Sequence, residues 1–243
     1  MIGIVGAMEE EVTLLRDAMS NLKVERSGEI EFFLGDLCGK KVVLLRCGIG
    51  KVHAAVGCSI LIEKYSPGLI INTGCAGGVN PDGFEPLSFG DLVISSGCVY
   101  HDFDISAFGY QRGQVPGRKD VKFTVDADII KLAEEAVLSL RKEKKLYSEF
   151  KMEPGLIASG DIFVYDSRLV MDLVNFFPEL RAVDMESAAI AHACDILGTR
   201  FVAFRCLSDV AGEESPVKFD EYLPVAVKNS SEIVKRLVEI YED

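Results

Sequence analysis

Acidic side chains follow three of the expected strands, at the positions where each strand ends. Glu11 lies after the opening strand, Glu186 follows a short strand near residue 183, and Asp209 closes the last strong strand. In α/β sheets ligands bind beyond the carboxyl ends of the strands, so side chains at that edge are candidates for chemistry. Carboxyl groups grouped there suit general acid–base work on a small polar molecule.

Each of these acids also has an ordinary structural interpretation. The run Glu9–Glu11 would form the acidic first turn of a helix, which the helix dipole favours. Asp184-Met185-Glu186 would cap another helix. Arg205 and Asp209 share one strand parity, so they would either converge at the site or serve in structural ion pairs. The residue pattern alone leaves both interpretations open.

Two glycine-rich segments also follow strands. Gly48-Ile49-Gly50-Lys51 precedes an expected helix, where glycines let a ligand approach the backbone. Residues Thr73–Gly78 hold three glycines and Cys75, and we expect them to form a turn after the strand Leu69–Asn72. Neither segment is a Walker A or a G-x-G-x-x-G motif. Three glycines in six residues indicate that some other group approaches this backbone closely.

The elements that must position these residues alternate between strands and helices, which indicates an α/β fold. We expect one domain over residues 1–243, with a central mixed sheet and helices on both faces. The expected strands are Ile2–Gly6, Ile30–Leu34, Lys41–Cys47, Leu69–Asn72, Asp91–Tyr100, Leu156–Ser159, Ala182–Val183 and Phe201–Leu207. The expected helices are Glu9–Met19, Val52–Tyr65, Ala127–Lys142, Ser167–Asn175, Ser187–Leu197 and Phe219–Tyr241.

Composition narrows the class of partner. The formal net charge of −12 at pH 7 argues against nucleic acid, because the surface would repel phosphates. No stretch is long and apolar enough to span a bilayer, so we expect no membrane partner. The 7 cysteines lack a C-x-x-C pair and indicate reduced thiols in the cytoplasm. The three histidines are scattered, so no metal site is expected.

Seven blocks of the chain, in order and nearly from end to end, resemble the bacterial 5′-methylthioadenosine/S-adenosylhomocysteine nucleosidases. The resemblance implies a nucleoside phosphorylase-like fold, a three-layer α/β/α sandwich. It also implies a cytoplasmic homodimer of methionine salvage that works without a metal or an organic cofactor. The blocks are Gly6–Glu11, Gly48–Lys51, Ile71–Gly74, Tyr100–Asp102, Ala107–Tyr110, Ser159–Asp161 and Ser208–Ala211.

The resemblance implies a role for each acid. Asp209 is similar to the general acid that protonates N7 of adenine, and Glu11 to the base that activates the attacking water. Glu186 matches the carboxylate that binds the ribose hydroxyls, with Met185 against the sugar. Arg205 is similar to an arginine near the water and ribose. Carboxylates suit this reaction, because cleavage of a ribosyl C–N bond develops oxocarbenium character that anions stabilise.

The resemblance also implies how the substrate is bound. Phe163 should stack on adenine, and the backbone of Val164 should read its edge. Ile49 and Phe219 should form walls of the ribose and alkylthio pocket. Three more residues, from the loop after residue 100, should reach the site of the neighbouring subunit. The remaining expected binding residues are Cys75, Ala76 and Ser208, and the residues expected from the partner are Ile105, Phe108 and Pro116.

The chain departs from the family pattern at two positions. The family usually has Ser where this chain has Cys75, and Glu where this chain has Asp184. Cys is a weaker hydrogen-bond donor than Ser, and Asp is one methylene shorter than Glu. These changes bear on substrate preference and rate. The segment Ser139–Glu153 is also longer and more charged than expected, which indicates a surface elaboration.

Three alternative functions compete with nucleoside hydrolysis. A nucleoside phosphorylase of the same fold would need arginines for phosphate, whereas the first loop carries three glutamates. A related hydrolase would act on 5′-deoxyadenosine, aminofutalosine or AMP, the last being disfavoured because no phosphate-binding domain is present. A non-catalytic binding protein on this fold would not need Glu11, Glu186 and Asp209. We expect an adenine nucleoside as the substrate.

Overall fold

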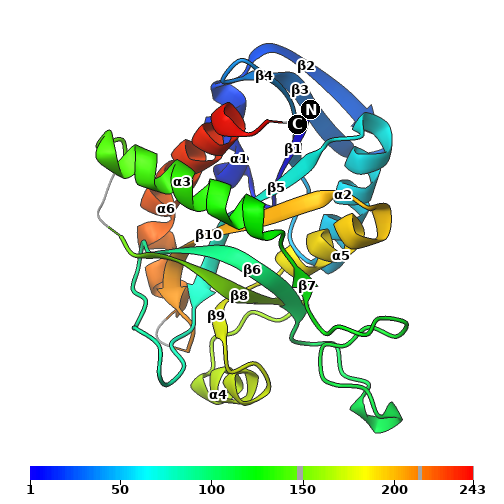
Figure 1. The fold of residues 1–243 in the computed structure, drawn as a ribbon, viewed down its shortest axis with the longest axis vertical. Coiled ribbons are helices and arrows are strands. Elements are labelled where there is room, and N and C mark those ends of the chain that lie inside the picture. The colour runs from blue at the N-terminus through cyan, green and yellow to red at the C-terminus, as the bar shows by residue number, and fades with distance from the viewer. Residues whose placement is uncertain (147–149, 213–214, 243) are drawn as a thin grey trace.

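The computed structural model describes residues 1–146, 150–212 and 215–242, with the backbone alone described for 215–222 (Figure 1). The strands in that part of the chain are β1 (Ile2–Gly6), β2 (Ser20–Ser27), β3 (Ile30–Leu37), β4 (Lys40–Arg46), β5 (Leu69–Gly78), β6 (Leu92–Tyr100), β7 (Phe123–Thr124), β8 (Met152–Ser159), β9 (Leu180–Asp184) and β10 (Arg200–Val210). The helices are α1 (Glu9–Asp17), α2 (Lys51–Tyr65), α3 (Ala127–Lys142), α4 (Ser167–Phe176), α5 (Ser187–Leu197) and α6 (Ser215–Ile240), with a short 3₁₀ turn at Ser106–Phe108.

These strands form one mixed sheet in the order β10-β6-β8-β9-β5-β1-β4-β3-β2, with β7 paired to β6. Strand β1 pairs in parallel with β4 and β5, whereas β2, β3 and β4 form an antiparallel meander. Strand β10 also pairs in parallel with β5, so β5, β10, β6, β8 and β9 close into a ring. Strands β1, β5 and β10 run parallel, so their carboxyl ends lie at one edge of the sheet, and β9, which runs antiparallel to β5, pairs with the last residues of β5.

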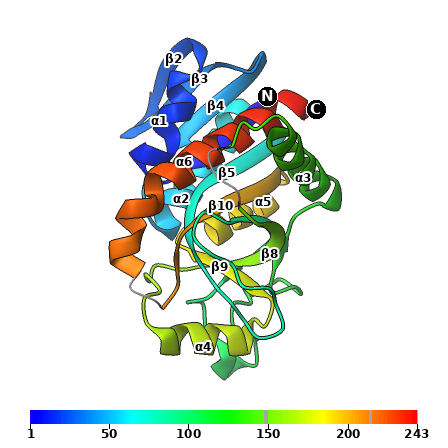
Figure 2. The ribbon, with the colours of Figure 1, turned by 90° about the vertical axis from the view of Figure 1, so that its left-hand side faces the viewer.

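Helices cover both faces of the sheet, as expected from the alternating pattern. Helices α1 and α3 pack on α6 over one face, and α2 packs on α5 over the other (Figure 2). The buried side of α3 is an apolar stripe that includes Ile129, Ala133, Val137 and Leu140. Strand β1 is buried along its whole length because helices lie on both of its faces. The expected α/β sandwich with a central mixed sheet is confirmed.

The prediction of a glycine-rich turn at Thr73–Gly78 was wrong. Strand β5 continues through that segment to Gly78 and pairs with β10 and β9. Glycine is a weak strand former, which is why the pattern indicated a turn. Here the missing side chains leave room for neighbours: a Cβ at Gly74 would lie 2.6 Å from Glu11, and one at Gly78 would lie 2.7 Å from Leu207.

Strand β2 was not predicted at all. Its residues are mostly exposed and polar, because it is the last strand of the sheet and pairs with β3 alone. Polar edge strands carry little of the hydrophobic alternation that a sequence can reveal. The predicted surface elaboration at Ser139–Glu153 begins in the last turns of α3, and residues 147–149 of it lie outside the described residues.

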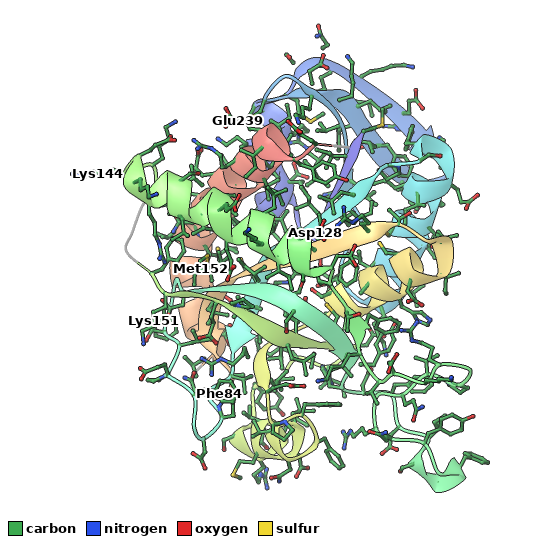
Figure 3. All side chains as sticks on the ribbon, viewed as in Figure 1. Phe84, Asp128, Lys144, Lys151, Met152 and Glu239 are labelled. Carbon is green, nitrogen blue, oxygen red and sulfur yellow. The ribbon has the colours of Figure 1, made fainter. Side chains whose placement is uncertain are left out.

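Two long loops extend beyond the sheet. One joins β5 to β6 and carries Phe84 (Figure 3), and Lys151, just before β8, donates from Nζ to the backbone oxygen of Pro86 in this loop at 2.9 Å. Arg181 fixes this loop by donating to the backbone oxygens of Val79 and Glu85. The other joins β6 to β7 and projects away from the body with the 3₁₀ turn at its tip (Figure 1). None of the described helices has the length and hydropathy required to traverse a bilayer.

Candidate active site

A cavity of about 230 Å³ opens at the carboxyl ends of β1, β5, β9 and β10. Four carboxylates from three segments of the chain line it, among walls that are otherwise mostly apolar. A concave, apolar pocket with a few convergent polar groups is typical of a small-molecule site. The residues around the cavity are Ala7, Met8, Glu11, Ile49, Cys75, Ala76, Gly77, Ile162, Phe163, Val164, Val183, Asp184, Met185, Glu186, Ser208 and Asp209.

Three backbone N–H groups hold the carboxylate of Glu11. Its Oε2 accepts hydrogen bonds from the backbone N–H groups of Ala7 at 2.7 Å and Met8 at 3.0 Å, and its Oε1 accepts from Cys75 at 3.1 Å. The bond from Met8 makes Glu11 the acidic half of the N-terminal cap of α1. Glu9, two residues earlier, turns outward to pair with Arg16 and leaves Glu11 to the cavity.

The environment of Glu11 suits a group that exchanges a proton. Burial raises the pKa of this carboxyl, and it is opposed by the charge of Arg205 and by the three backbone N–H donors. The net effect is that the pKa of Glu11 lies above the ordinary value for a glutamate. A base whose pKa is raised toward neutrality is a better proton acceptor at cellular pH than an ordinary glutamate.

Arg205 lies behind the cavity instead of in its wall. Its side chain is 2% exposed, and Nε donates to Oδ2 of Asp184 at 2.7 Å. Nη2 donates to Oδ1 of Asn72 at 2.6 Å, and Nη1 donates to the backbone oxygen of Phe204 at 2.9 Å. The sequence left ion pairing and convergence on the site open for Arg205. In the structure Arg205 forms an ion pair with Asp184, and Asp184 in turn lines the cavity.

Asp184 is the centre of a buried polar network. It accepts hydrogen bonds from the hydroxyls of Ser159 and Ser187 as well as from Arg205. The Ser187 hydroxyl also lies 3.1 Å from Oδ1 of Asn72, which closes the network. Buried networks in which every member is satisfied hold their residues in one arrangement. The shorter side chain at position 184 is thus fully engaged with its own partners, and Cys75 is not among those that the structure records.

Glu186 is another buried acid that lines the cavity. Its Oε1 accepts a hydrogen bond of 2.8 Å from the backbone N–H of Gly50, at the entrance to α2. Burial and the nearby charge of Asp184 raise the pKa of Glu186 to about 7, against the Gly50 N–H and Arg205, which lower it. Gly50 has φ +95°, a conformation that glycine adopts without strain and that aims its N–H at Glu186.

Asp209 completes the set from the far end of β10. Its side chain is 2% exposed, and its Oδ1 accepts a hydrogen bond of 2.9 Å from the hydroxyl of Ser208. The pairing of β10 with β5 shifts register between Leu207 and Asp209. This bulge takes Asp209 out of the regular alternation and into the cavity wall, opposite Gly77.

The apolar walls come from three unconnected segments. Phe163 is exposed enough to receive a flat ligand, whereas Val164 beside it is buried. Ile49 and Met185 face the cavity from the loop before α2 and from the end of β9. Cys75 and Ala76 form part of the floor on β5. Most of the apolar residues that line the cavity were therefore among those expected from the sequence. Their functional roles stay predictions.

The residues expected to reach a partner subunit are not part of the lining of this cavity. Ile105, Phe108 and Pro116 belong to the projecting loop between β6 and β7, and none of them lines the cavity of its own chain. Phe108 is 82% exposed. The expected wall residue Phe219 lies in α6, but its side chain is outside the described residues. In the part of the chain that is described, no group of three or more His, Cys, Asp or Glu side chains is arranged to hold a metal ion.

The chain matches known proteins over nearly its full length. Residues 1–239 match the model of the phosphorylase superfamily. The 5′-methylthioadenosine/S-adenosylhomocysteine nucleosidase of Bacillus pumilus is 43% identical over 237 residues, covering 98% of this chain and 97% of the relative. The Bacillus subtilis nucleosidase is 41% identical with the same coverage. This chain belongs to the 5′-methylthioadenosine/S-adenosylhomocysteine nucleosidase family.

Solved structures agree with membership of the nucleosidase family. The Neisseria meningitidis nucleosidase in complex with methylthio-immucillin-A is 40% identical, with a TM-score of 0.90 and 99% of each chain covered. The Colwellia psychrerythraea 34H nucleosidase in complex with adenine is also 40% identical, with a TM-score of 0.89, over 98% of this chain and 93% of that one. A futalosine hydrolase mutant of Helicobacter pylori is 29% identical, with a TM-score of 0.88 and 99% of each chain covered. The nucleoside phosphorylase-like fold is confirmed.

Several residues that shape the site of this nucleosidase family member were not predicted. Ile162, Val183 and Gly77 line the cavity, and Asn72 anchors Arg205 beneath it. Ile162 and Gly77 adjoin predicted residues, so extending each motif by one residue would have found them. Asn72 carried a weaker signal: it is a polar residue at the end of an otherwise apolar strand, where burial demands a partner.

Proposed function

We propose that this protein hydrolyses the N-glycosidic bond of 5′-methylthioadenosine and S-adenosylhomocysteine, releasing adenine and the 5′-thio-substituted ribose. The observation that carries the proposal is the convergence of Glu11, Glu186 and Asp209, each buried, on one apolar cavity. The family relationship supports it, since relatives at 41–44% identity carry this name. We also propose that residues 1–243 form a single nucleosidase domain.

The proposed reaction uses the three acids in different roles. Asp209 donates a proton to N7 of adenine, so that the base departs from C1′ with the C1′–N9 bonding electrons as a neutral molecule. Glu11 accepts a proton from the water whose oxygen bonds to C1′. The oxocarbenium-like transition state lies between these events, and the anions around the ribose stabilise its positive charge. Glu186 accepts hydrogen bonds from the ribose hydroxyls and fixes the sugar between the two.

The same cavity favours hydrolysis over phosphorolysis. Glu11, Asp184, Glu186 and Asp209 all line it, and among the described residues of its lining there is no Lys, Arg or His whose cation could hold a phosphate ion. A phosphorylase must hold that ion with cationic groups or backbone N–H groups beside C1′. Here the backbone N–H groups of Ala7, Met8 and Cys75 are already bonded to Glu11. Water is therefore the nucleophile that this site accommodates.

The 5′-substituent is the least constrained part of the proposed substrate. The futalosine hydrolase of Helicobacter pylori has the same fold at 29% identity, which makes aminofutalosine a specific second candidate besides 5′-deoxyadenosine. The wall expected to contact that substituent includes Ile49 and Phe219. Ile49 is apolar and half exposed, which suits an alkylthio group.

Adenine release measured across a substrate panel tests the proposal. The panel contains methylthioadenosine, adenosylhomocysteine, 5′-deoxyadenosine and aminofutalosine, each with and without inorganic phosphate. We expect the highest kcat/KM for the two thio-substituted nucleosides, free ribose products, and rates independent of phosphate. A phosphate requirement with a ribose-1-phosphate-type product would replace hydrolysis by phosphorolysis. No adenine release from any substrate would refute an enzymatic function.

We further propose that the protein works as a cytoplasmic homodimer in methionine salvage. Phe108 supports an interface, because an aromatic ring that is 82% exposed on a projecting loop loses water contact when a partner covers it. Sedimentation equilibrium should give twice the chain mass of 26.6 kDa. Phe108→Ser should shift the distribution toward monomer, and an unchanged monomeric mass for both proteins would refute the dimer.

A further inference from the structure

Two walls of the cavity have no regular secondary structure to hold them. The segment Ile49–Gly50 lies between β4 and α2, and the segment 162–164 lies between β8 and α4. Both have exposed apolar side chains: Ile49 is 54% exposed and Phe163 is 45% exposed. Neither segment belongs to a helix or a strand, so its position must be set by contacts with other parts of the chain.

Three charged residues adjoining these walls bond to one another. The ammonium of Lys51 lies 2.5 Å from Oδ2 of Asp102 and 3.8 Å from Oδ2 of Asp161. The backbone N–H of Asp161 donates to the same oxygen of Asp102 at 2.9 Å. The backbone N–H of Lys51 donates to Oδ1 of Asp161 at 2.8 Å. Each pair of the three is thus joined directly, across loops that follow β4, β6 and β8.

The triad of Lys51, Asp102 and Asp161 continues into the carboxylate site on one side. Gly50 precedes Lys51, and its N–H donates to Glu186. A Cβ at Gly50 would lie 3.0 Å from Oδ1 of Asp161, so the two loops approach as closely as glycine allows. Movement of Asp161 would therefore displace Gly50 and the N–H that fixes Glu186.

On its other side the triad continues into the aromatic wall. Ile162, Phe163 and Val164 follow Asp161 directly in the chain and all line the cavity. Asp102 is the fixed point, since its side chain is 12% exposed and it follows the buried strand β6. Burial would raise the pKa of Asp102, but the Lys51 ammonium and the Asp161 N–H hold it below its usual range, so this carboxylate is charged at neutral pH.

We propose that Lys51, Asp102 and Asp161 are positioning residues that set the distance between the aromatic wall at 162–164 and the Gly50–Glu186 contact. This inference rests on the proposed function, since it assigns the two walls to the two halves of an adenine nucleoside. The aromatic wall receives the base and Glu186 receives the ribose, so one ion triad controls the gap in which the N-glycosidic bond is held. None of the three residues lines the cavity.

A positioning role predicts a defined pattern of effects. Lys51→Met keeps the aliphatic stem and removes the charge, which frees Asp161 and the wall that follows it. We expect KM for methylthioadenosine to rise about tenfold, since small displacements of binding groups have large costs, while kcat changes much less. The Kd of adenine, a ligand that reports on the base wall alone, should rise by a similar factor in calorimetry. Lys51→Arg retains a cation and should restore both values.

A matched control separates this role from general stability. Lys235 is 26% exposed and ion-paired with Glu232 on α6, and Lys51 is 25% exposed, so Lys235→Met removes a comparable pair away from the cavity. We expect wild-type KM and adenine Kd for it. Asp102→Asn is a second variant of unchanged size that should shift KM and Kd in the same direction as Lys51→Met.

Two results would overturn the inference. One is an unchanged adenine Kd in both Lys51→Met and Asp102→Asn. The other is a fall in kcat with KM and Kd at wild-type values, which would mean that the triad acts on the chemistry and not on the walls. The proposed function is tested separately by adenine release from the wild-type protein, because a protein that binds adenine without releasing it would refute hydrolysis and leave the Kd comparison intact.

Discussion

The backbone of Gly74 lies against the carboxylate of Glu11 so closely that a Cβ at position 74 would be 2.6 Å from Oε1. The two residues are 63 positions apart, on β5 and at the start of α1. The contact also brings the N–H of Cys75 to Oε1 at 3.1 Å. The position of the proposed base therefore depends on the absence of a side chain on a neighbouring strand.

Gly74→Ala should displace Glu11 and inactivate the enzyme. A misplacement of about 1 Å at a catalytic group costs on the order of 10²-fold in rate, so we expect a fall in kcat of at least that size. Steady-state adenine release measures it. Gly3→Ala is the control, since its Cβ would meet methyl groups of Ile70 and Leu61 at the opposite end of β1. That variant should lose stability but keep kcat, and equal activity losses in the two variants would contradict the prediction.

Asp209→Asn should nearly abolish adenine release while the protein stays folded. An amide of the same shape still accepts the hydrogen bond from Ser208, but it has no acidic proton to give to the leaving base. General acid catalysis typically contributes about 10²- to 10⁴-fold, and the loss in kcat should fall in that range. Circular dichroism and Tm serve as the folding check. Turnover close to that of the wild type would refute the general-acid assignment.

Glu186 should impose a pH dependence on substrate capture. Burial and the charge of Asp184 raise its pKa to about 7, so its carboxyl is protonated below that pH and becomes a carboxylate above it. Only the carboxylate offers both oxygens to the ribose hydroxyls, so kcat/KM should fall as pH decreases through about 7. Glu186→Gln should lose this dependence and show a kcat/KM lower by roughly 10- to 100-fold above pH 7, the worth of a hydrogen bond to a charged group.

Comparing the pH profiles of the wild type and Glu186→Gln controls for other titrating groups. Both proteins contain Glu11 and act on the same substrate, so only the titration of Glu186 differs. A limb near pH 7 that persists in Glu186→Gln would show that another group titrates there. Such a result would remove Glu186 from the ribose contact as a carboxylate.

Cys75→Ser should be tolerated. The contact of this residue with Glu11 is made by its backbone N–H, which the substitution leaves in place. Burial raises the pKa of the Cys75 thiol, so it is neutral, as a serine hydroxyl would be. We expect kcat/KM to change by less than about tenfold, as for other near-isosteric replacements. Cys38→Ser at the surface is the matched control, and a loss of 100-fold confined to Cys75→Ser would reveal a direct role for the sulfur.

Elements with strong periodicity could be predicted from the sequence. The apolar runs at β1 and β10 and the amphipathic stripe of α3 identify these elements because burial selects residue type with a fixed period. The segments that failed lacked that signal. Strand β2 is exposed at the edge of the sheet, and the last residues of β5 are glycines that propensity assigns to a turn. Their strand conformation is imposed by pairing with neighbours that are distant in sequence.

Some residues of the candidate site could also be predicted from the sequence, whereas others could not. The acids Glu11, Glu186 and Asp209 follow predictable strand ends, and the resemblance to the nucleosidases assigned each a role. The place of Arg205 was left open by the sequence, because an arginine on a strand faces the cavity or the layer beneath it according to packing. In the structure it donates to Asp184 and Asn72 and is buried below the cavity.

The sequence by itself determined the fold class, the family and the set of acids at the strand ends, since these follow from local periodicity and from motifs that occur in order along the chain. Only the tertiary structure decided that Gly74 gives room to Glu11, that Asp184 is engaged by Arg205, and that Lys51 bridges Asp102 and Asp161. The physical reason is that electrostatic and steric contacts depend on distances of a few ångströms between residues far apart in sequence, and chain folding alone sets those distances.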